Sequence, residues 1–319
     1  MPARIGIDAL TALAHAPGAG RYARELIRAL APLCAPGELV LYEVGSAQRV
    51  LPRSSLGAGV QLPSRASRRP RRLNAWVPWW RHADRELGGV RIFHQTAPVP
   101  LPLAEALPTR AFAELPDPAQ AHELRGLAAA FVFSRAVQAG LVGSGVLPPE
   151  RVHLVPVGCE HWARELPLPL PSPTRPRIGM LGRERPLERR PLWREFASAR
   201  GWEWLELGPG TPESELPRAV AGCSAILHLT DAIGTPVTAL ECMRLGVPIV
   251  TREAEVFRSA LGSAGLWADP RDPPSVAHAL TRALARRSDP LWQEQARRQS
   301  EPWTWSACAR AHLEVWRQL

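Results

Sequence analysis

The feature that most constrains this sequence is the alternation of short apolar runs with longer segments whose apolar residues recur at helical spacing. Residues 4–10 read RIGIDAL and residues 38–44 read ELVLYEV, and both runs are typical of buried strands. The segment 20–33 between them is amphipathic at helical spacing. Because parallel strands need a crossover connection of about this length, the sequence predicts an α/β fold built on parallel sheets.

The same alternation continues to the end of the chain and divides it into two parts. Further strands are predicted at 90–94, 128–134, 151–157, 177–182, 202–208, 225–229, 247–251 and 265–269, and closing helices at 275–287 and 305–319. Residues 166–176 read LPLPLPSPTRP, and their prolines cannot donate the hydrogen bonds of a central strand. We therefore predict one domain over 1–165, a linker over 166–176 and a second domain over 177–319, whose last helix could pack back on the first domain.

The composition excludes several classes of protein. A chain of 319 residues fits two domains of about 150 residues each, and no apolar run approaches the roughly 18 residues of a membrane span. No secretory signal is evident, so a cytoplasmic location is expected. The five cysteines lack metal-binding or disulfide spacing, and no metal site is predicted. All 39 basic residues are arginine, which excludes Schiff-base and P-loop lysine chemistry.

The net charge of +9 is concentrated in one segment. Residues 49–91 hold ten arginines against two acidic residues, and the part at 64–85 also contains Trp76, Trp79 and Trp80. This mixture suits a membrane interface, anionic lipids or nucleic acid. No nucleic-acid-binding module is recognisable, so we expect no nucleic-acid partner and keep peripheral membrane contact through 64–85 as an open alternative.

The stretch 233–251, IGTPVTALECMRLGVPIVT, carries the most chemical information. Gly234 and Thr235 form a turn that leads into a helix, where backbone N–H groups and the helix dipole favour a diphosphate. Glu241, two turns later, could accept hydrogen bonds from a ribose diol, or it could be an exposed helix glutamate. Thr238 could belong to the same site or only cap the helix.

This stretch resembles the donor-site signature of the group 1 glycosyltransferases of the GT-B type, which retain the sugar's configuration. The matching positions are Gly234, Thr235, Pro236, Val237, Thr238, Glu241, Met243, Gly246, Val247 and Pro248. Residues 18–30, 133–160 and 259–280 resemble other segments of the same family. The resemblance implies two Rossmann-like domains with parallel sheets facing across a cleft, an acceptor-side N-terminal domain and a nucleotide-sugar domain at the C-terminus.

The resemblance also implies roles for particular residues. Arg183 matches an arginine that binds the donor diphosphate, and a second cation would be Arg189, or Arg190 if one residue is inserted. Arg185, Arg189 and Arg190, which alternate with Glu184 and Glu188, could instead form a solvated charged loop, from which only Arg183 stands out. Gly18 and Gly20 would lie in a loop that faces the acceptor, a glycan or a lipid-linked molecule. The reaction implied is metal-independent sugar transfer from a nucleotide-sugar, with no cofactor.

The chain departs from the family pattern at two places. Ile233 stands where the resemblance implies the first glutamate of the donor motif, and Asp231 lies nearby at the wrong spacing. The histidine and acidic residue that the family carries in its first domain are missing, and only Glu114 and Asp117 follow the corresponding segment. No catalytic residue can be named, and His94 is expected to have a packing role.

The expected function is that of a glycosyltransferase of the hexosyltransferase type. One alternative is a degenerate GT-B protein without activity, which serves as a partner or regulator, and Ile233 motivates it. A nucleotide-sugar epimerase is a further alternative, because that activity also occurs on this fold.

Overall fold

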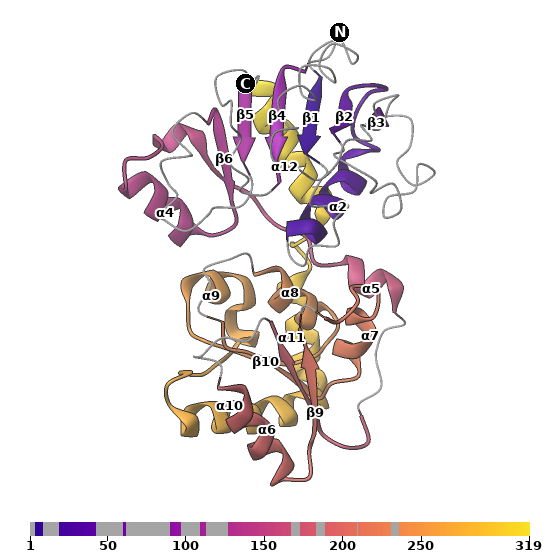
Figure 1. Cartoon of the computed structure of the whole chain (residues 1–319), viewed down its shortest axis with the longest axis vertical. Helices are drawn as coiled ribbons and strands as arrows, with labels where there is room; N and C mark the ends of the chain where they lie inside the picture. Colours follow the sequence, from indigo (N-terminus) through magenta and orange to yellow (C-terminus); the bar gives the residue numbers. More distant parts are fainter. Residues whose placement is uncertain are drawn as a thin grey trace, which may run out of the picture. The chain divides into compact units, whose positions relative to one another are not determined.

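The structure is a computed structural model, and it describes residues 4–8, 19–42, 60–61, 90–96, 109–112, 127–166, 173–182, 189–208, 210–230 and 236–319. The chain forms two compact units, one from Met1–Val157 with Trp305–Leu319 and the other from Gly158–Thr304. Each unit is built on its own parallel sheet, with helices packed on it (Figure 1). The predicted α/β class is confirmed.

The first unit contains a seven-stranded sheet of order β3-β2-β1-β4-β5-β6-β7. The strands are β1 (Ile5–Asp8), β2 (Leu39–Tyr42), β3 (Val60–Gln61), β4 (Ile92–Gln95), β5 (Thr109–Phe112), β6 (Ala129–Val132) and β7 (Val152–Leu154). Its described helices are α2 (Ala19–Leu30), α4 (Arg135–Gly143) and α12 (Trp305–Gln318), with a 3-10 turn at Pro149–Arg151. The five strands expected in this half are present, and β3 and β5 are additional.

Helix α12 belongs to the first unit although it ends the chain, as the yellow helix among the indigo and magenta elements of Figure 1 shows. The hydroxyl of Tyr22 on α2 lies 2.8 Å from His312 Nε2 on α12 and 3.3 Å from His94 Nε2 on β4. The His312 ring stacks on Phe131 of β6 at 4.2 Å. All four side chains are buried, so α12 completes the core of this unit.

The second unit contains a five-stranded sheet of order β12-β11-β10-β8-β9. The strands are β8 (Arg177–Leu181), β9 (Glu203–Leu207), β10 (Ala225–His228), β11 (Ile249–Thr251) and β12 (Leu266–Trp267). The helices are α5 (His161–Glu165), α6 (Arg190–Ser198), α7 (Leu216–Ala221), α8 (Val237–Arg244), α9 (Glu255–Leu261), α10 (Pro273–Arg287) and α11 (Pro290–Ser300), with a 3-10 turn at Gly262–Ala264. All five strands predicted for this half are present.

The two faces of the second sheet are packed differently. Ile178, Leu227 and Val250 point to the face that buries the apolar side of α10. On the other face, a Cβ at Gly179 would lie 2.6 Å from Ile226 Cδ1 and 2.8 Å from Cys223 Sγ. Glycine is therefore required at 179, because neighbouring side chains fill the space that any larger residue would occupy.

The division between the units lies earlier than the predicted linker. The first unit ends at Val157, eight residues before the expected end of the first domain at 165. The reason is that helix α5, which we assigned to the first domain, packs on α7 and α8 of the second unit. Of the predicted linker 166–176, residues 167–172 lie outside the described residues.

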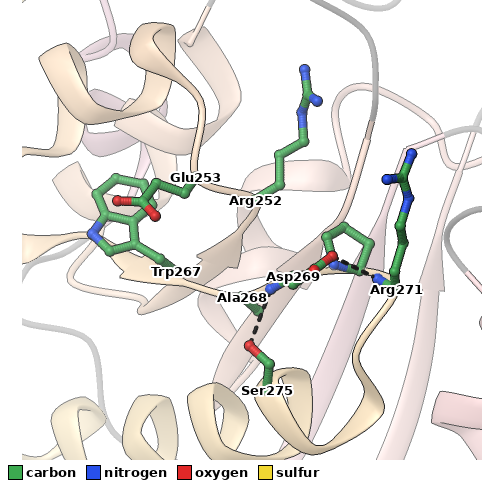
Figure 2. A pocket seen from close by; sticks show the side chains of 8 residues that line it. Arg252, Glu253, Trp267, Ala268, Asp269, Arg271 and Ser275 are labelled. Carbon is green, nitrogen blue, oxygen red and sulfur yellow. Dashed lines mark hydrogen bonds between the residues drawn. The ribbon is translucent and has the colours of Figure 1, made fainter.

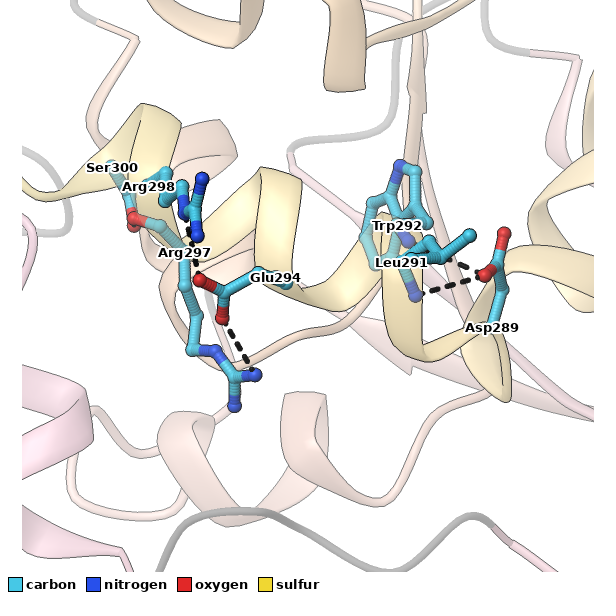
Figure 3. A network of polar contacts seen from close by, with 7 residues as sticks. All are labelled: Asp289, Leu291, Trp292, Glu294, Arg297, Arg298 and Ser300. Carbon is cyan, nitrogen blue, oxygen red and sulfur yellow. Dashed lines mark hydrogen bonds and ion pairs between the residues drawn. The ribbon is translucent and has the colours of Figure 1, made fainter.

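Helix α11 shows why a highly polar segment folds in this unit (Figure 3). Its N-cap, Asp289, accepts hydrogen bonds from the N–H groups of Leu291 and Trp292 at 3.0 and 3.3 Å. Glu294 pairs with arginines three and four residues later, and Trp292 is buried with its Nε1 donating to the carbonyl of Ala264. The cap and the buried indole fix a helix whose other surface is solvated.

Candidate functional site

The two segments that carry the predicted donor residues follow the carboxyl ends of two neighbouring inner strands of the second sheet, β8 and β10. Strands β8 and β10 are neighbours in parallel register, with Gly179 beside Ile226 and Met180 beside Leu227. The chain leaves β8 toward β9 on one side and leaves β10 toward β11 on the other. Strand order therefore reverses between β8 and β10, and ligands of open α/β sheets bind outside the carboxyl ends at such a point.

Helix α8 follows the end of β10 and contains the second half of the donor motif. Its N-cap is Pro236, which makes no side-chain capping bond, so the alternative that Thr238 caps the helix is wrong. Val237 is buried and Thr238 is half-buried. Gly234, Thr235, Ile233 and Asp231 lie outside the described residues.

The end of α8 explains the Gly-Val-Pro part of the motif. Gly246 has a φ of 69°, its N–H donates to the carbonyl of Met243, and the Val247 N–H donates to the carbonyl of Cys242. This pair of bonds is a Schellman motif, which ends a helix with a left-handed residue that is usually glycine. The turn then leads directly into β11.

Glu241 lies on α8 and is fully buried, so the alternative of an exposed helix glutamate is wrong. Its Oε1 lies 2.9 Å from Nε2 of His161, the first residue of α5, and the His161 side chain is only 8% exposed. A carboxylate in such surroundings is stable only when polar partners surround it, because burial of an unpaired charge is costly. The imidazole is thus a polar neighbour of the carboxylate, although the close Nε2–Oε1 pair lacks hydrogen-bond geometry. A ribose diol can reach Glu241 only if covering groups move.

The two candidate second cations have different surroundings. Arg189 is exposed, with a φ of 47°, and directly precedes helix α6. Arg190 is buried, and its guanidinium lies 2.6 Å from Glu206 Oε2 and donates to the carbonyl of Gly182 at 2.8 Å. The reading as a solvated loop is therefore wrong for Arg190, which ties the end of β8 to β9. Arg183 lies outside the described residues.

Glu206, near the end of β9, forms ion pairs with Arg190 and Arg194. Partial burial acts to raise the pKa of its carboxyl group, but hydrogen bonds from Trp204, Arg194 and Arg190 outweigh it and lower the pKa. Glu206 is therefore ionised at neutral pH, and Arg190 is held by a charge pair beside the candidate site.

The structure adds two residues that the sequence did not single out, His161 and His228. His228 ends β10, and its burial, together with the charge of Arg190, lowers its pKa to about 4. Among the described residues, neither its Nδ1 nor the Oγ1 of Thr251, its register partner on β11, has a hydrogen-bond partner. The sequence AILHL does not single out His228, because one histidine in an apolar strand has the pattern of a packed core residue.

The acceptor-side residues are only partly described. Gly18 lies outside the described residues, as do Glu114, Asp117 and the basic segment 64–85. Gly20 is buried in the first turn of α2, so the expectation that it lies in a loop is wrong, because the amphipathic helix already begins at Ala19. His94 is buried in the Tyr22 network, where burial and the nearby His312 hold its pKa well below the usual value, as suits a packing role.

The described residues contain neither a metal-binding cluster nor a membrane-spanning helix. No group of three or more His, Cys, Asp or Glu side chains there is placed to hold a metal ion. None of the described helices has the length and apolar character needed to cross a membrane.

Comparison with known proteins places this geometry in context. No protein-family model matches the chain. An O-antigen chain mannosyltransferase B of Escherichia coli is 26% identical over 132 residues, which are 40% of this chain and only 34% of that protein. The fold is similar to that of a glycosyltransferase from Rickettsia africae, with a TM-score of 0.68 and 12% identity over 99% of this chain and 98% of the other.

Two further solved structures show how widely the fold is used. Anabaena HepE, solved with UDP and glucose, has a TM-score of 0.65 and 12% identity over 99% of this chain and all of its own. A Listeria monocytogenes protein named as a UDP-N-acetylglucosamine 2-epimerase has a TM-score of 0.63 and 10% identity, covering 100% of this chain and 96% of that one. The chain thus has the GT-B fold of two Rossmann-like domains, and similarity at this level establishes the fold alone.

Proposed function

We propose that the protein is a glycosyltransferase that transfers a sugar from a nucleotide-sugar to a glycan or lipid-linked acceptor. The observation that carries the proposal is that both donor segments start at the carboxyl ends of β8 and β10, where the strand order reverses. The GT-B fold, shared with HepE in its complex with UDP and glucose, supports it. The partial similarity to a mannosyltransferase points to the same class of reaction.

In this proposal the second unit binds the nucleotide part of the donor. Gly234 and Thr235 precede α8 and present backbone N–H groups to the diphosphate, and Arg183 adds a bidentate guanidinium. Pro236, Val237 and Thr238 form the start of the helix whose dipole faces the same group. Arg190 donates to the carbonyl of Gly182, the residue that precedes Arg183 in the sequence. Arg189 serves as the second cation.

Glu241 binds the ribose diol, and His161 orients it. The imidazole of His161 lies 2.9 Å from one carboxylate oxygen, and in this proposal the two ribose hydroxyls donate to the same carboxylate. His161 follows the segment 155–160 that enters the second unit, so its position is fixed by α5 rather than by α8. In this reading His161 is a positioning residue for nucleotide recognition.

The chemistry proposed needs neither a resident cofactor nor a metal ion. The arginines, the backbone amides and the helix dipole stabilise the negative charge that develops on the departing nucleoside diphosphate. The resemblance implies retention of configuration at the transferred carbon. We place the reaction in the cytoplasm, with membrane contact through 64–85 when the acceptor is lipid-linked.

Ile233 favours a second candidate, a protein of this fold that binds a nucleotide but does not transfer sugar. The isoleucine side chain cannot accept the hydrogen bonds that a glutamate would accept from the hydroxyl groups of the sugar. The test is calorimetric titration with a panel of nucleoside diphosphates and their sugars, followed by a hydrolysis assay on those that bind. Binding with slow hydrolysis supports the transferase, binding without hydrolysis supports the second candidate, and a C2-epimerised product would replace both with an epimerase.

A further inference from the structure

A cavity lies at the carboxyl ends of β11 and β12, and β11 is the neighbour of β10 in the sheet. Its volume is about 500 Å³, and its lining includes Arg252, Glu253, Trp267, Asp269, Arg271 and Ser275 (Figure 2). No residue of the proposed donor site lines it. The volume is that of a site for a small molecule, and the location suits one, because ligands of α/β sheets bind at the carboxyl ends of strands.

The acidic groups of this cavity are already engaged. Glu253 is paired with Arg258 of α9. Asp269 Oδ1 accepts the backbone N–H of Arg271 at 2.9 Å, and the N–H of Asp269 donates to Ser275 Oγ at 3.1 Å. These bonds fix the turn between β12 and α10, and they reduce the capacity of both carboxylates to bind a cation.

The lining of the cavity also includes two arginines. Arg252 and Arg271 come from two different turns, and Figure 2 shows both side chains extended in the same direction, away from helix α10. Arg271 is exposed, and its guanidinium forms no ion pair with any residue that the structure describes. The lining carboxylate Glu253 is offset by Arg258, and two guanidinium groups that point the same way favour an anion beside them.

Trp267 gives the cavity a flat, rigid wall. Its indole lies against Gly265, where an added Cβ would come within 2.3 Å of the ring atom Cζ2. The glycine thus leaves room for the indole in one position, and the ring remains partly exposed at the edge strand. A fixed aromatic wall binds a ring-shaped ligand without a large loss of side-chain entropy.

We propose that this cavity binds an anionic saccharide, with the sugar ring against Trp267 and a phosphate or carboxylate group on Arg271 and Arg252. The indole of Trp267 would pack against the apolar face of a sugar ring, and the two guanidinium groups would bind the anionic group. Its lining shares no residue with the proposed nucleotide site, and the proposal does not rest on the proposed function.

The test is calorimetric titration of the full chain with glucose 6-phosphate, glucose and inorganic phosphate, each with and without excess UDP. We expect glucose 6-phosphate to bind more tightly than either glucose or phosphate, with the same affinity when UDP is present. Arg271→Ala and Trp267→Ala should each weaken the binding of glucose 6-phosphate by about tenfold. Arg282→Ala, which removes an exposed arginine from α10, is the matched control and should change nothing.

Three outcomes would overturn the inference. One is the absence of glucose 6-phosphate binding up to about 10 mM, beyond the weakest affinities expected for such a site. Another is competition by UDP, which would place the saccharide in the nucleotide site. The third is binding that Arg271→Ala and Trp267→Ala leave unchanged while their unfolding curves match that of the parent protein. Trp267→Phe, which keeps an aromatic wall, should retain most of the affinity.

Discussion

His161 Nε2 lies 2.9 Å from Glu241 Oε1, and this contact joins helix α5 to helix α8 inside the second unit. The two residues are 80 positions apart, and both side chains are buried. The contact gives the segment that enters the second unit a direct part in the geometry of the proposed nucleotide site. It also makes the helix α8 carboxylate dependent on a residue outside the donor motif.

Loss of the histidine should therefore destabilise the protein. His161→Ala leaves a buried carboxylate without its imidazole, and we expect the free energy of unfolding to fall by about 3 kcal/mol. His161→Gln places an amide N–H near the position of Nε2 and should lose less than half as much. Guanidinium unfolding monitored by circular dichroism measures both variants, and equal stability of His161→Ala and the parent would contradict a stabilising contact.

The buried histidines of the first unit predict sensitivity to acid. Burial lowers the pKa of His312 from 6.5 to about 4, and it also lowers the pKa of His94. Because the unfolded chain then binds more protons, stability is complete above about pH 6.5 and is lost as the pH falls toward 4. One such histidine accounts for about 2 kcal/mol between pH 7 and pH 5.

His312→Phe keeps an aromatic ring on Phe131 but cannot be protonated. We expect it to lower stability at pH 7, because Tyr22 loses a hydrogen bond, and to reduce the loss between pH 7 and pH 5 by about 2 kcal/mol. Urea unfolding at the two pH values measures this difference. His278→Asn, at an exposed position on α10, is the control, and an unchanged pH dependence in His312→Phe would show that the network does not titrate as described.

Two glycines should respond oppositely to the same substitution. Gly179→Ala places a methyl group against Ile226 and Cys223 in the sheet, and we expect a loss of about 2 kcal/mol. Gly140→Ala on α4 meets no atom within 4 Å, and alanine should stabilise this helix by about 0.5–1 kcal/mol. Thermal unfolding compares the two, and a destabilised Gly140→Ala would contradict the open space beside Gly140.

Arg189 offers a test that separates backbone strain from ligand binding. Its φ of 47° is unfavourable for a residue with a side chain, so Arg189→Gly should raise stability by up to about 1 kcal/mol. If Arg189 is the second phosphate-binding cation, the same variant should weaken nucleoside diphosphate binding by about tenfold. Higher stability with unchanged affinity would remove Arg189 from the donor site, and titration beside thermal unfolding decides between the two results.

The sequence predicted the parallel strands well because each is a short apolar run between breakers, as RIGML at β8 and IGID at β1 illustrate. It missed β5, whose residues Thr109–Phe112 include an arginine, and it missed β3, which has only two residues. Periodicity carries too little signal in such short or polar strands. β3 and β5 belong to the sheet because they pair with neighbouring strands, and their own composition does not reveal this.

The donor motif is recognisable because its residues lie within one short stretch, 234–248, and because its glycine at 246 suits a left-handed helix end. The contact of Glu241 with His161 cannot be recognised in the sequence, because these two residues are far apart in the chain and meet only through the packing of α5 on α8. The same limit explains why the sequence does not show the division of the units after Val157 or the different surroundings of Arg189 and Arg190. Local pattern cannot show which of two adjacent arginines finds a carboxylate on the next strand.

The measurement that most directly tests the account is calorimetric comparison of a ribonucleoside diphosphate with its 2′-deoxy analogue, using the base that binds best. The proposed ribose contact predicts that the parent protein prefers the ribonucleotide by about tenfold, and that Glu241→Ala binds both at the weaker affinity. His161→Ala should lose part of the preference and His161→Gln should recover it. Equal binding of the two nucleotides by the parent protein, or a preference that survives in Glu241→Ala, would contradict the assignment of Glu241 to the ribose.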